Sequence, residues 1–190
     1  YHIDDTAYLF VADQIMKDPL RPYSFHFEWG TYSGPASYFM NTPLIPYYIA
    51  LVSLLFGRTE VILHLSFVIF PIIAGVSFYF IAKRFIEWPL MATLIMISTP
   101  TFLVNSNNLM LDVPMASIFL LATALFIYGV EKNNHKLLFL GSIVAGFAFL
   151  AKPHALVIVP LLLLYLFLKN KQKFMLYMLI PFIFVALFSL

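Results

Sequence analysis

The chain is a series of long apolar stretches joined by short loops, and the charges in these loops alternate along the sequence. Basic residues collect in three loops: Lys83 and Arg84; Lys132, His135 and Lys136; and Lys169, Lys171 and Lys173. Asp112 and the Lys152-Pro153-His154 step lie in the loops between them, and Asp4 and Asp5 precede the first stretch. Basic loops at the ends of membrane helices mark the cytoplasmic side. The pattern therefore predicts repeated membrane crossings, with the carboxylates gathered on the extracytoplasmic side.

Composition excludes several classes of protein. The chain is 62% hydrophobic and only 11% charged, whereas a soluble domain has about 25% charged residues. Such a chain has too few polar side chains for a water-facing surface, so we expect it to lie in a bilayer. The net charge of +2 is spread over separate loops, which argues against a nucleic-acid partner. There is no cysteine, which excludes disulfides, a thiolate nucleophile and Cys-ligated metal.

The chain starts at Tyr1 without an initiator methionine and stops at Leu190 inside an apolar run. We expect it to be a piece of a longer membrane protein, with at least one hydrophobic helix upstream and further sequence downstream.

The predicted fold class is all-α, a polytopic transmembrane helix bundle with an extracytoplasmic loop that carries interfacial helices. Residues 1–60 form this loop, and residues 61–190 form the bundle. Within the loop, residues 5–16 show one apolar stripe and predict a short helix, followed by loop punctuated by Pro and Gly. Residues 43–56 are apolar, but a helix of this length spans roughly 21 Å, less than the roughly 30 Å hydrocarbon core. We therefore expect an interfacial helix there, not a crossing.

The bundle is predicted to contain about six crossings, and their order fixes the side of every loop. The crossings are 61–84, 89–106, 112–130, 137–152, 154–168 and 174–190. Pro71, Pro100, Pro160 and Pro181 are expected to kink helices, which neighbouring helices make tolerable. Small residues around Gly141 and Gly146 indicate close helix packing.

Three acidic residues are candidates for chemistry. Asp4 and Asp5 open the outer segment, and a carboxylate next to an apolar surface can serve as a general base. Asp112 is predicted to share their side of the membrane, where an acid at a helix end is a functional candidate. The alternative for all three is a helix N-cap, since Asp is favoured there, and the two roles are compatible.

A cation and a histidine are candidates for binding a phosphate. Lys152 stands on the predicted outer side, unlike the other lysines of the bundle. It is a point charge suited to a lipid phosphate, and His154 could assist. The alternative is a lysine that snorkels to the interface. His26 and Glu28 are a weak metal signal, because zinc and hard cations need more ligands.

Five short motifs resemble a known family when they are read in order. They are Asp4-Asp5-Thr6, Asn41-Thr42-Pro43-Leu44 followed by Tyr47-Tyr48, Ile81-Ala82-Lys83-Arg84-Phe85, Met110-Leu111-Asp112-Val113-Pro114-Met115 and Gly146-Phe147-Ala148-Phe149-Leu150-Ala151-Lys152. With them the chain resembles the membrane-embedded GT-C glycosyltransferases, in the family 39-like group. That group includes the dolichyl-phosphate-mannose protein mannosyltransferases and the bacterial aminoarabinose transferases of lipid A.

The resemblance implies a plasma- or cell-membrane glycosyltransferase with an extracytoplasmic active site. Its donor is a polyprenyl-phosphate sugar, its acceptor is a protein or a lipid, and it lies among membrane lipids. Asp4, Asp5 and Asp112 are the implied catalytic residues, and Lys152, His154 and Asn41 the implied substrate-binding residues. Two departures from the family pattern are Asp5, where Glu is frequent, and Thr42-Pro43, where two prolines are usual. Met40 stands where some relatives carry a Glu for metal binding, so we expect no cofactor and no metal.

Two other classes remain open at this point. A transporter or lipid-linked-sugar translocase would use the carboxylates to bind a coupling ion or a proton. Transporters place ionisable groups near the middle of the membrane and commonly show repeats, whereas the acids here lie at helix ends and no repeat is visible. A purely structural membrane subunit accounts for the helices but not for the acids.

Overall fold

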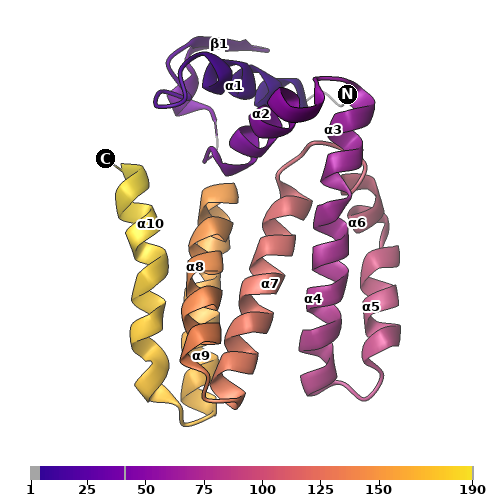
Figure 1. The fold of residues 1–190 in the computed structure, drawn as a ribbon, viewed down its shortest axis with the longest axis vertical. Coiled ribbons are helices and arrows are strands. Elements are labelled where there is room, and N and C mark those ends of the chain that lie inside the picture. The colour runs from indigo at the N-terminus through magenta and orange to yellow at the C-terminus, as the bar shows by residue number, and fades with distance from the viewer. Residues whose placement is uncertain (1–4, 41, 190) are drawn as a thin grey trace.

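The computed structural model describes residues 5–40 and 42–189. Most of the chain forms helical columns that stand side by side, while the N-terminal elements lie across one end of them (Figure 1). The columns, in chain order, are α3 (Glu60–Phe67) with α4 (Ile69–Phe85), α5 (Pro89–Ser98) with α6 (Pro100–Asn105), α7 (Asp112–Glu131), α8 (His135–Ala151), the 3₁₀ helix η2 (Pro153–Val157) with α9 (Ile158–Leu168), and the 3₁₀ helix η3 (Gln172–Leu179) with α10 (Ile180–Ser189). Their order follows the six predicted crossings.

Two of these helical runs are long and apolar enough to cross a membrane by themselves. They are Glu60–Phe85, with 26 residues, and Asp112–Glu131, with 20 residues. The remaining columns are built from shorter apolar helices, so six crossings stay a prediction. Large apolar side chains such as Phe80, Leu94 and Leu164 are exposed on the sides of the columns, which is consistent with a surface in contact with lipid.

The helices are interrupted just before each of the four prolines at which kinks were predicted. Pro100 is the first residue of α6, and Pro71, Pro160 and Pro181 lie in the first turns of α4, α9 and α10. A proline in the first turn of a helix loses no intrahelical hydrogen bond. The backbone stays helical at Val68, Ile158 and Ile180, so Pro71, Pro160 and Pro181 lie at irregular points of columns that continue. Thr99 is extended, so Pro100 alone among the four begins a separate helix.

The N-terminal segment contains a small sheet as well as the expected helices. Its elements are α1 (Asp5–Lys17), β1 (His26–Trp29), β2 (Tyr32–Pro35), the 3₁₀ helix η1 (Ala36–Tyr38) and α2 (Leu44–Phe56). The helices predicted at 5–16 and 43–56 are confirmed as α1 and α2. The hairpin was not predicted, and it corrects the all-α description.

The hairpin has a local physical cause. The antiparallel strands pair Trp29 with Tyr32 across a two-residue turn, where Gly30 has a φ of 59° that L side chains rarely adopt. Phe27 points inward from β1 while His26 and Glu28 are exposed. This alternation of apolar and polar residues is the signal for a strand with one buried face.

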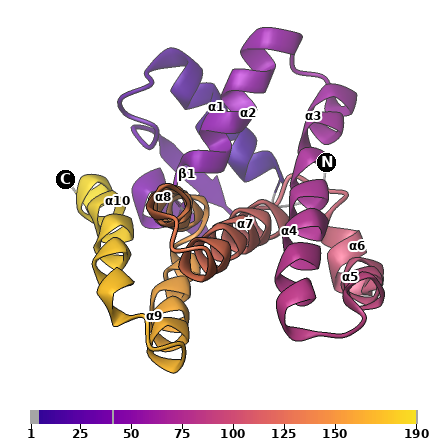
Figure 2. The same cartoon turned by 60° about the horizontal axis from the view of Figure 1, so that its bottom comes forward.

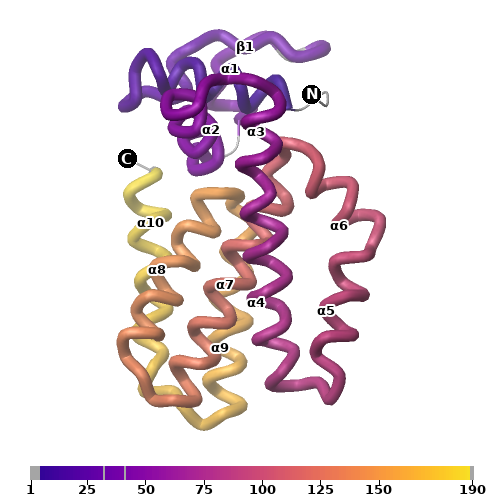
Figure 3. Tube along the Cα trace, turned by 45° about the vertical axis from the view of Figure 1, so that its right-hand side comes forward, coloured from indigo at the N-terminus to yellow at the C-terminus, as the bar shows by residue number. Residues whose placement is uncertain are grey.

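One hydrophobic core joins the N-terminal segment to the end of the bundle. Buried residues from both parts belong to it: Leu9, Val11, Ile15, Ile45, Ile49, Leu63, Phe67, Leu109, Leu111, Val113 and Ala151. In two views α2 lies across the bundle end instead of continuing along the columns (Figures 1 and 3). The segment is thus packed onto the ends of α4, α7 and α8. The domain boundary at residues 60 and 61 stays a prediction, and this core extends across it.

Glycines allow the central helices to approach closely. A Cβ on Gly141 of α8 would lie 3.0 Å from the amide nitrogen of Phe126 in α7. A Cβ on Gly146 would lie 2.2 Å from the ring of Phe184 in α10. The packing predicted around these two glycines is confirmed, and Figure 2 shows α7, α8 and α10 obliquely from below.

The loops of the bundle segregate by charge in space. The turns that join α4 to α5, α7 to α8, and α9 to η3 lie at the end far from the N-terminal segment (Figures 1 and 3). All three basic groups lie in or beside these turns. There Arg84 pairs with Glu131 at 3.0 Å and lies 4.0 Å over the ring of Tyr128. Asp112 and Lys152 lie at the opposite end.

Candidate functional site

Asp112 and Lys152 form an ion pair at the end of the bundle that faces the N-terminal segment. Asp112 is the first residue of α7, and Lys152 directly follows α8. The Lys152 Nζ atom donates to Asp112 Oδ1 at 2.6 Å, and the two side chains are 24% and 41% exposed. The pair is therefore partly shielded yet open to a ligand. The sequence placed both residues on one side but did not predict that they pair.

Asp5 links the N-terminal segment to the loop that leads into α7. Its side chain is fully buried, and its Oδ1 atom accepts a 2.9 Å hydrogen bond from the backbone amide of Leu109. This bond runs to a distant element, so Asp5 holds α1 to the loop before α7. Leu109 stands three residues before Asp112, which brings two of the predicted acids to the same loop.

Asp4 and Asn41 lie outside the residues that the structure describes. Asp4 remains a predicted partner of Asp5, and Asn41 remains a predicted substrate-binding residue. The neighbour of Asn41 is described: Thr42 is 1% exposed and donates from Oγ1 to the carbonyl oxygen of Phe149 at 3.1 Å. The predicted motif at 41–44 therefore meets the end of α8, three residues before Lys152. The sequence identifies Thr42 only as a departure from the usual double proline and predicts no role for it.

His154 lies in η2 with its side chain exposed. It borders an apolar pocket of about 420 Å³. The other residues that line this pocket are Met115, Ala116, Phe119, Leu120, Ala155 and Val157. Met115 is one turn from Asp112, so the pocket begins next to the ion pair.

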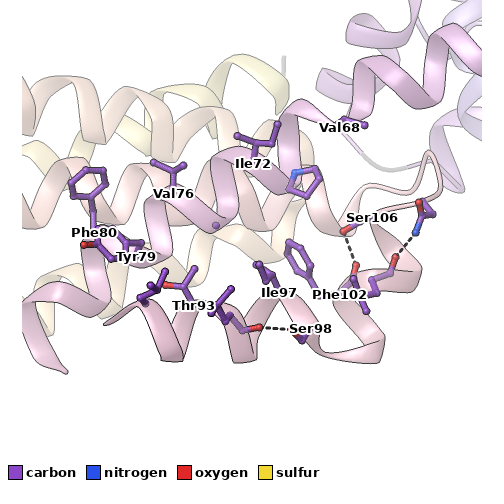
Figure 4. Close-up of a pocket in the computed structure, with 16 residues that line it drawn as sticks. Val68, Ile72, Val76, Tyr79, Phe80, Thr93, Ile97, Ser98, Phe102 and Ser106 are labelled. Atoms are coloured by element: carbon purple, nitrogen blue, oxygen red, sulfur yellow. Dashed lines mark hydrogen bonds between the residues drawn. The ribbon is translucent and has the colours of Figure 1, made fainter. Parts of the chain in front are cut away.

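A larger apolar groove lies between α4 and the α5–α6 column (Figure 4). Three of the hydroxyl groups that line it are turned back on their own helices. Thr93, Ser98 and Ser106 donate to the carbonyl oxygens of Pro89, Leu94 and Phe102. No acidic or basic side chain lines this groove. The groove therefore offers mainly hydrocarbon surface, and the charged candidate groups lie elsewhere.

Metal ligands do not come together in the described part of the chain. His26 and Glu28 lie on the exposed side of β1, and residues 5–40 and 42–189 contain no group of three His, Asp or Glu residues placed to hold a metal. A metal site normally needs at least three protein ligands. Independence from metal stays a prediction.

Two tyrosines of the N-terminal segment are poor candidates for proton acceptors. The Tyr47 hydroxyl donates to the Pro19 carbonyl oxygen. Burial raises the pKa of the Tyr23 hydroxyl, with a smaller contribution from Tyr47. Burial also raises the pKa of Tyr47, with a smaller contribution from Asp18. Both hydroxyls therefore stay protonated at physiological pH, and neither is a candidate base.

Comparison with protein families decides the class. The family model described as dolichyl-phosphate-mannose-protein mannosyltransferase matches residues 40–190. The chain belongs to this family. The match confirms the resemblance to the GT-C, family 39-like group. Members of this family are membrane glycosyltransferases that use polyprenyl-phosphate sugar donors, so the chain is a membrane glycosyltransferase of this kind. The matched range includes Thr42, Asp112 and Lys152, whereas Asp5 precedes it.

No curated protein and no solved structure matches the chain. Residue roles in this mannosyltransferase family member therefore rest on its own geometry. That geometry joins a cation, a partly exposed carboxylate and a buried carboxylate at one end of the bundle. Such a set is suited to hold an anionic group and to take up a proton.

Proposed function

We propose that the chain transfers a sugar from a polyprenyl phosphate to a hydroxyl of a protein or lipid acceptor, on the extracytoplasmic face. The observation that carries the proposal is the 2.6 Å ion pair between Lys152 and Asp112. It lies at the bundle end opposite the basic loops. By the positive-inside tendency that end is extracytoplasmic.

Lys152 is the proposed ligand of the donor phosphate. As the sugar leaves, the bond between the anomeric carbon and the phosphate oxygen breaks, and its electron pair stays on the phosphate. An ammonium group stabilises that developing charge without needing a metal. Before the donor binds, Asp112 holds Lys152 in place. The phosphate then competes with Asp112 for the ammonium group, and His154 lies two residues away to assist.

A carboxylate of the Asp4–Asp5 pair is the proposed general base. It takes the proton of the acceptor hydroxyl while the hydroxyl oxygen forms its bond to the anomeric carbon. Asp5 is fully buried and holds the amide of Leu109, so its fixed position favours a role close to Asp112. Its burial also means that α1 and the 107–112 loop must separate before Asp5 itself can contact an acceptor.

The transporter alternative is less well supported by the positions of the charges. In α7 and α8 the ionisable residues are Asp112, Glu131, His135 and Lys136, which all lie at helix ends. A coupling-ion site near the middle of the bundle would need such groups farther inside.

The test is transfer by the full-length protein, reconstituted in membranes with labelled polyprenyl-phosphate sugars and candidate acceptors. We expect label to appear on an acceptor and to be lost in Lys152→Ala protein. Movement of the labelled lipid across the membrane without a glycosylated product would instead establish a translocase.

A further inference from the structure

The end of α8 contains a backbone carbonyl that its own helix cannot satisfy. In a continuous helix the carbonyl of Phe149 would accept from the amide of residue 153, but that residue is Pro153, which has no N–H group. A residue that precedes proline is also driven to an extended conformation, and Lys152 has φ −159° and ψ 129°. The helix therefore ends at Ala151, and the Phe149 carbonyl lacks its intrahelical donor.

Thr42 supplies the missing donor from another part of the chain. Its hydroxyl reaches the Phe149 carbonyl oxygen at 3.1 Å across 107 positions, in a buried contact. A buried carbonyl without a partner is unfavourable, so the contact specifies how the N-terminal segment docks on α8. Phe149, which accepts this hydrogen bond, lies three positions before Lys152.

The backbone next to Asp112, the acidic member of the ion pair, is also held by the N-terminal segment. The amide of Leu109, three positions before Asp112, donates to Asp5 of α1. The N-terminal segment thus holds the backbone on both sides of the pair, through Asp5 on the α7 side and through Thr42 on the α8 side.

We propose that Thr42 is a positioning residue for Lys152: its hydrogen bond to the Phe149 carbonyl fixes the end of α8 and thereby the ammonium group that receives the donor phosphate. The inference rests on the proposed function, because it gives Lys152 a phosphate to bind. Thr42 itself contacts neither donor nor acceptor in this role and acts through the backbone.

The test compares substitutions that keep or remove the hydroxyl in the full-length, reconstituted enzyme. Thr42→Val keeps the size of the side chain but cannot donate, whereas Thr42→Ser can. We expect Thr42→Val to raise the KM for the polyprenyl-phosphate sugar about tenfold, with a smaller change in the KM for the acceptor. Thr42→Ser should restore most of the donor affinity. Thr93→Val is the matched control, because the Thr93 hydroxyl bonds only to Pro89 within its own helix, and its donor KM should not change.

A double-mutant cycle separates positioning from general stability. If Thr42 acts through Lys152, Thr42→Val should have little further effect on donor KM in Lys152→Ala protein. An equal effect of Thr42→Val in both backgrounds would overturn the inference while leaving the proposed function intact. An unchanged donor KM in Lys152→Ala alone would instead overturn the assignment of the phosphate to Lys152.

A milder substitution protects the test against loss of folding. Thr42→Cys has a similar size and a weak S–H donor, so its donor KM should lie between those of the Ser and Val proteins. A donor KM that is the same in the Ser and Cys proteins would contradict a role for the hydrogen bond.

Discussion

The carboxylate of Asp5 accepts a 2.9 Å hydrogen bond from the amide of Leu109, although 104 positions separate the two residues. Both residues are fully buried, so the bond fixes α1 against the loop that carries Asp112. This contact connects a predicted base to the ion pair, and it makes the chemical role of Asp5 separable from its structural role.

Replacing Asp5 with Asn should separate those two roles. The carboxamide oxygen of Asn can still accept from Leu109, but it cannot take up a proton. We expect folded protein with nearly unchanged donor binding and a transfer rate lowered by about 10²–10⁴-fold, the usual effect of losing a general base. Rates come from initial-velocity measurements, and donor binding from titration.

Asp13→Asn is the matched control on the same helix. Asp13 pairs with Arg58 in a partly exposed contact, and such pairs contribute only about 0–1 kcal/mol. Its transfer rate should stay close to that of the wild type. Full activity in both Asp4→Asn and Asp5→Asn proteins would reduce the acidic pair to a structural role.

The two members of the ion pair should respond differently to substitution. Lys152→Ala removes a phosphate contact and leaves Asp112 unpaired, so we expect weaker donor binding as well as a lower rate. A hydrogen bond to a charged group contributes about 1.5–3 kcal/mol, which corresponds to roughly 10–150-fold in affinity.

Asp112→Asn should lower the rate less than Asp5→Asn does. Lys83→Ala, at the opposite end of the bundle, should leave both quantities unchanged, and equal losses in Lys83→Ala and Lys152→Ala would argue against a phosphate site.

The close approach of α7 and α8 at Gly141 should be sensitive to a single methyl group. The Cβ of Gly141→Ala would lie 3.0 Å from the Phe126 amide nitrogen and 3.2 Å from the Ala122 carbonyl oxygen. Backbone atoms cannot move aside cheaply, so we expect a loss of about 1–3 kcal/mol in the free energy of unfolding. Gly75→Ala in α4 is the comparison, since its nearest neighbour would be 3.7 Å away, and it should be neutral or stabilising by up to about 1 kcal/mol. Thermal unfolding in detergent measures both, and equal melting temperatures would contradict this packing.

The sidedness of the bundle can be tested with single cysteines, because the chain has none. Cysteines at positions 107 and 153 should react with an impermeant reagent from outside the cell. Cysteines at positions 136 and 169 should react only after permeabilisation. These inner positions avoid Asn134, whose side chain caps α8. Labelling of positions 107 and 136 from the same side would refute the predicted topology.

Transfer should continue in the presence of a chelator. His26 and Glu28 lie on the exposed side of β1, and the described residues contain no third ligand grouped with them. We expect the same initial rate with and without EDTA. Loss of activity in EDTA, followed by recovery with one divalent ion, would show that a metal takes part.

Much of the fold could be predicted from the sequence because lipid imposes simple requirements. A chain with few charges and long apolar stretches must form helices in the bilayer, and short loops make consecutive helices neighbours. The bounds of α1, α2 and α7 follow from periodicity, length and the positions of charges. The hairpin of β1 and β2 was missed, because four-residue strands give a weak periodic signal next to the surrounding prolines and glycines.

The candidate site, too, could be predicted only in part from the sequence. The available residue types can be read from the sequence. That Asp112 and Lys152 lie at one end of the bundle also follows from it, since helix direction alternates. The folded arrangement was needed to show that these two side chains meet, that Asp5 holds the Leu109 amide, and that Thr42 bonds to the end of α8. Those contacts join residues 40 to 107 positions apart. The spacing of residues along one chain sets local geometry, whereas contacts at this range depend on how helices rotate and dock as a shared core becomes buried.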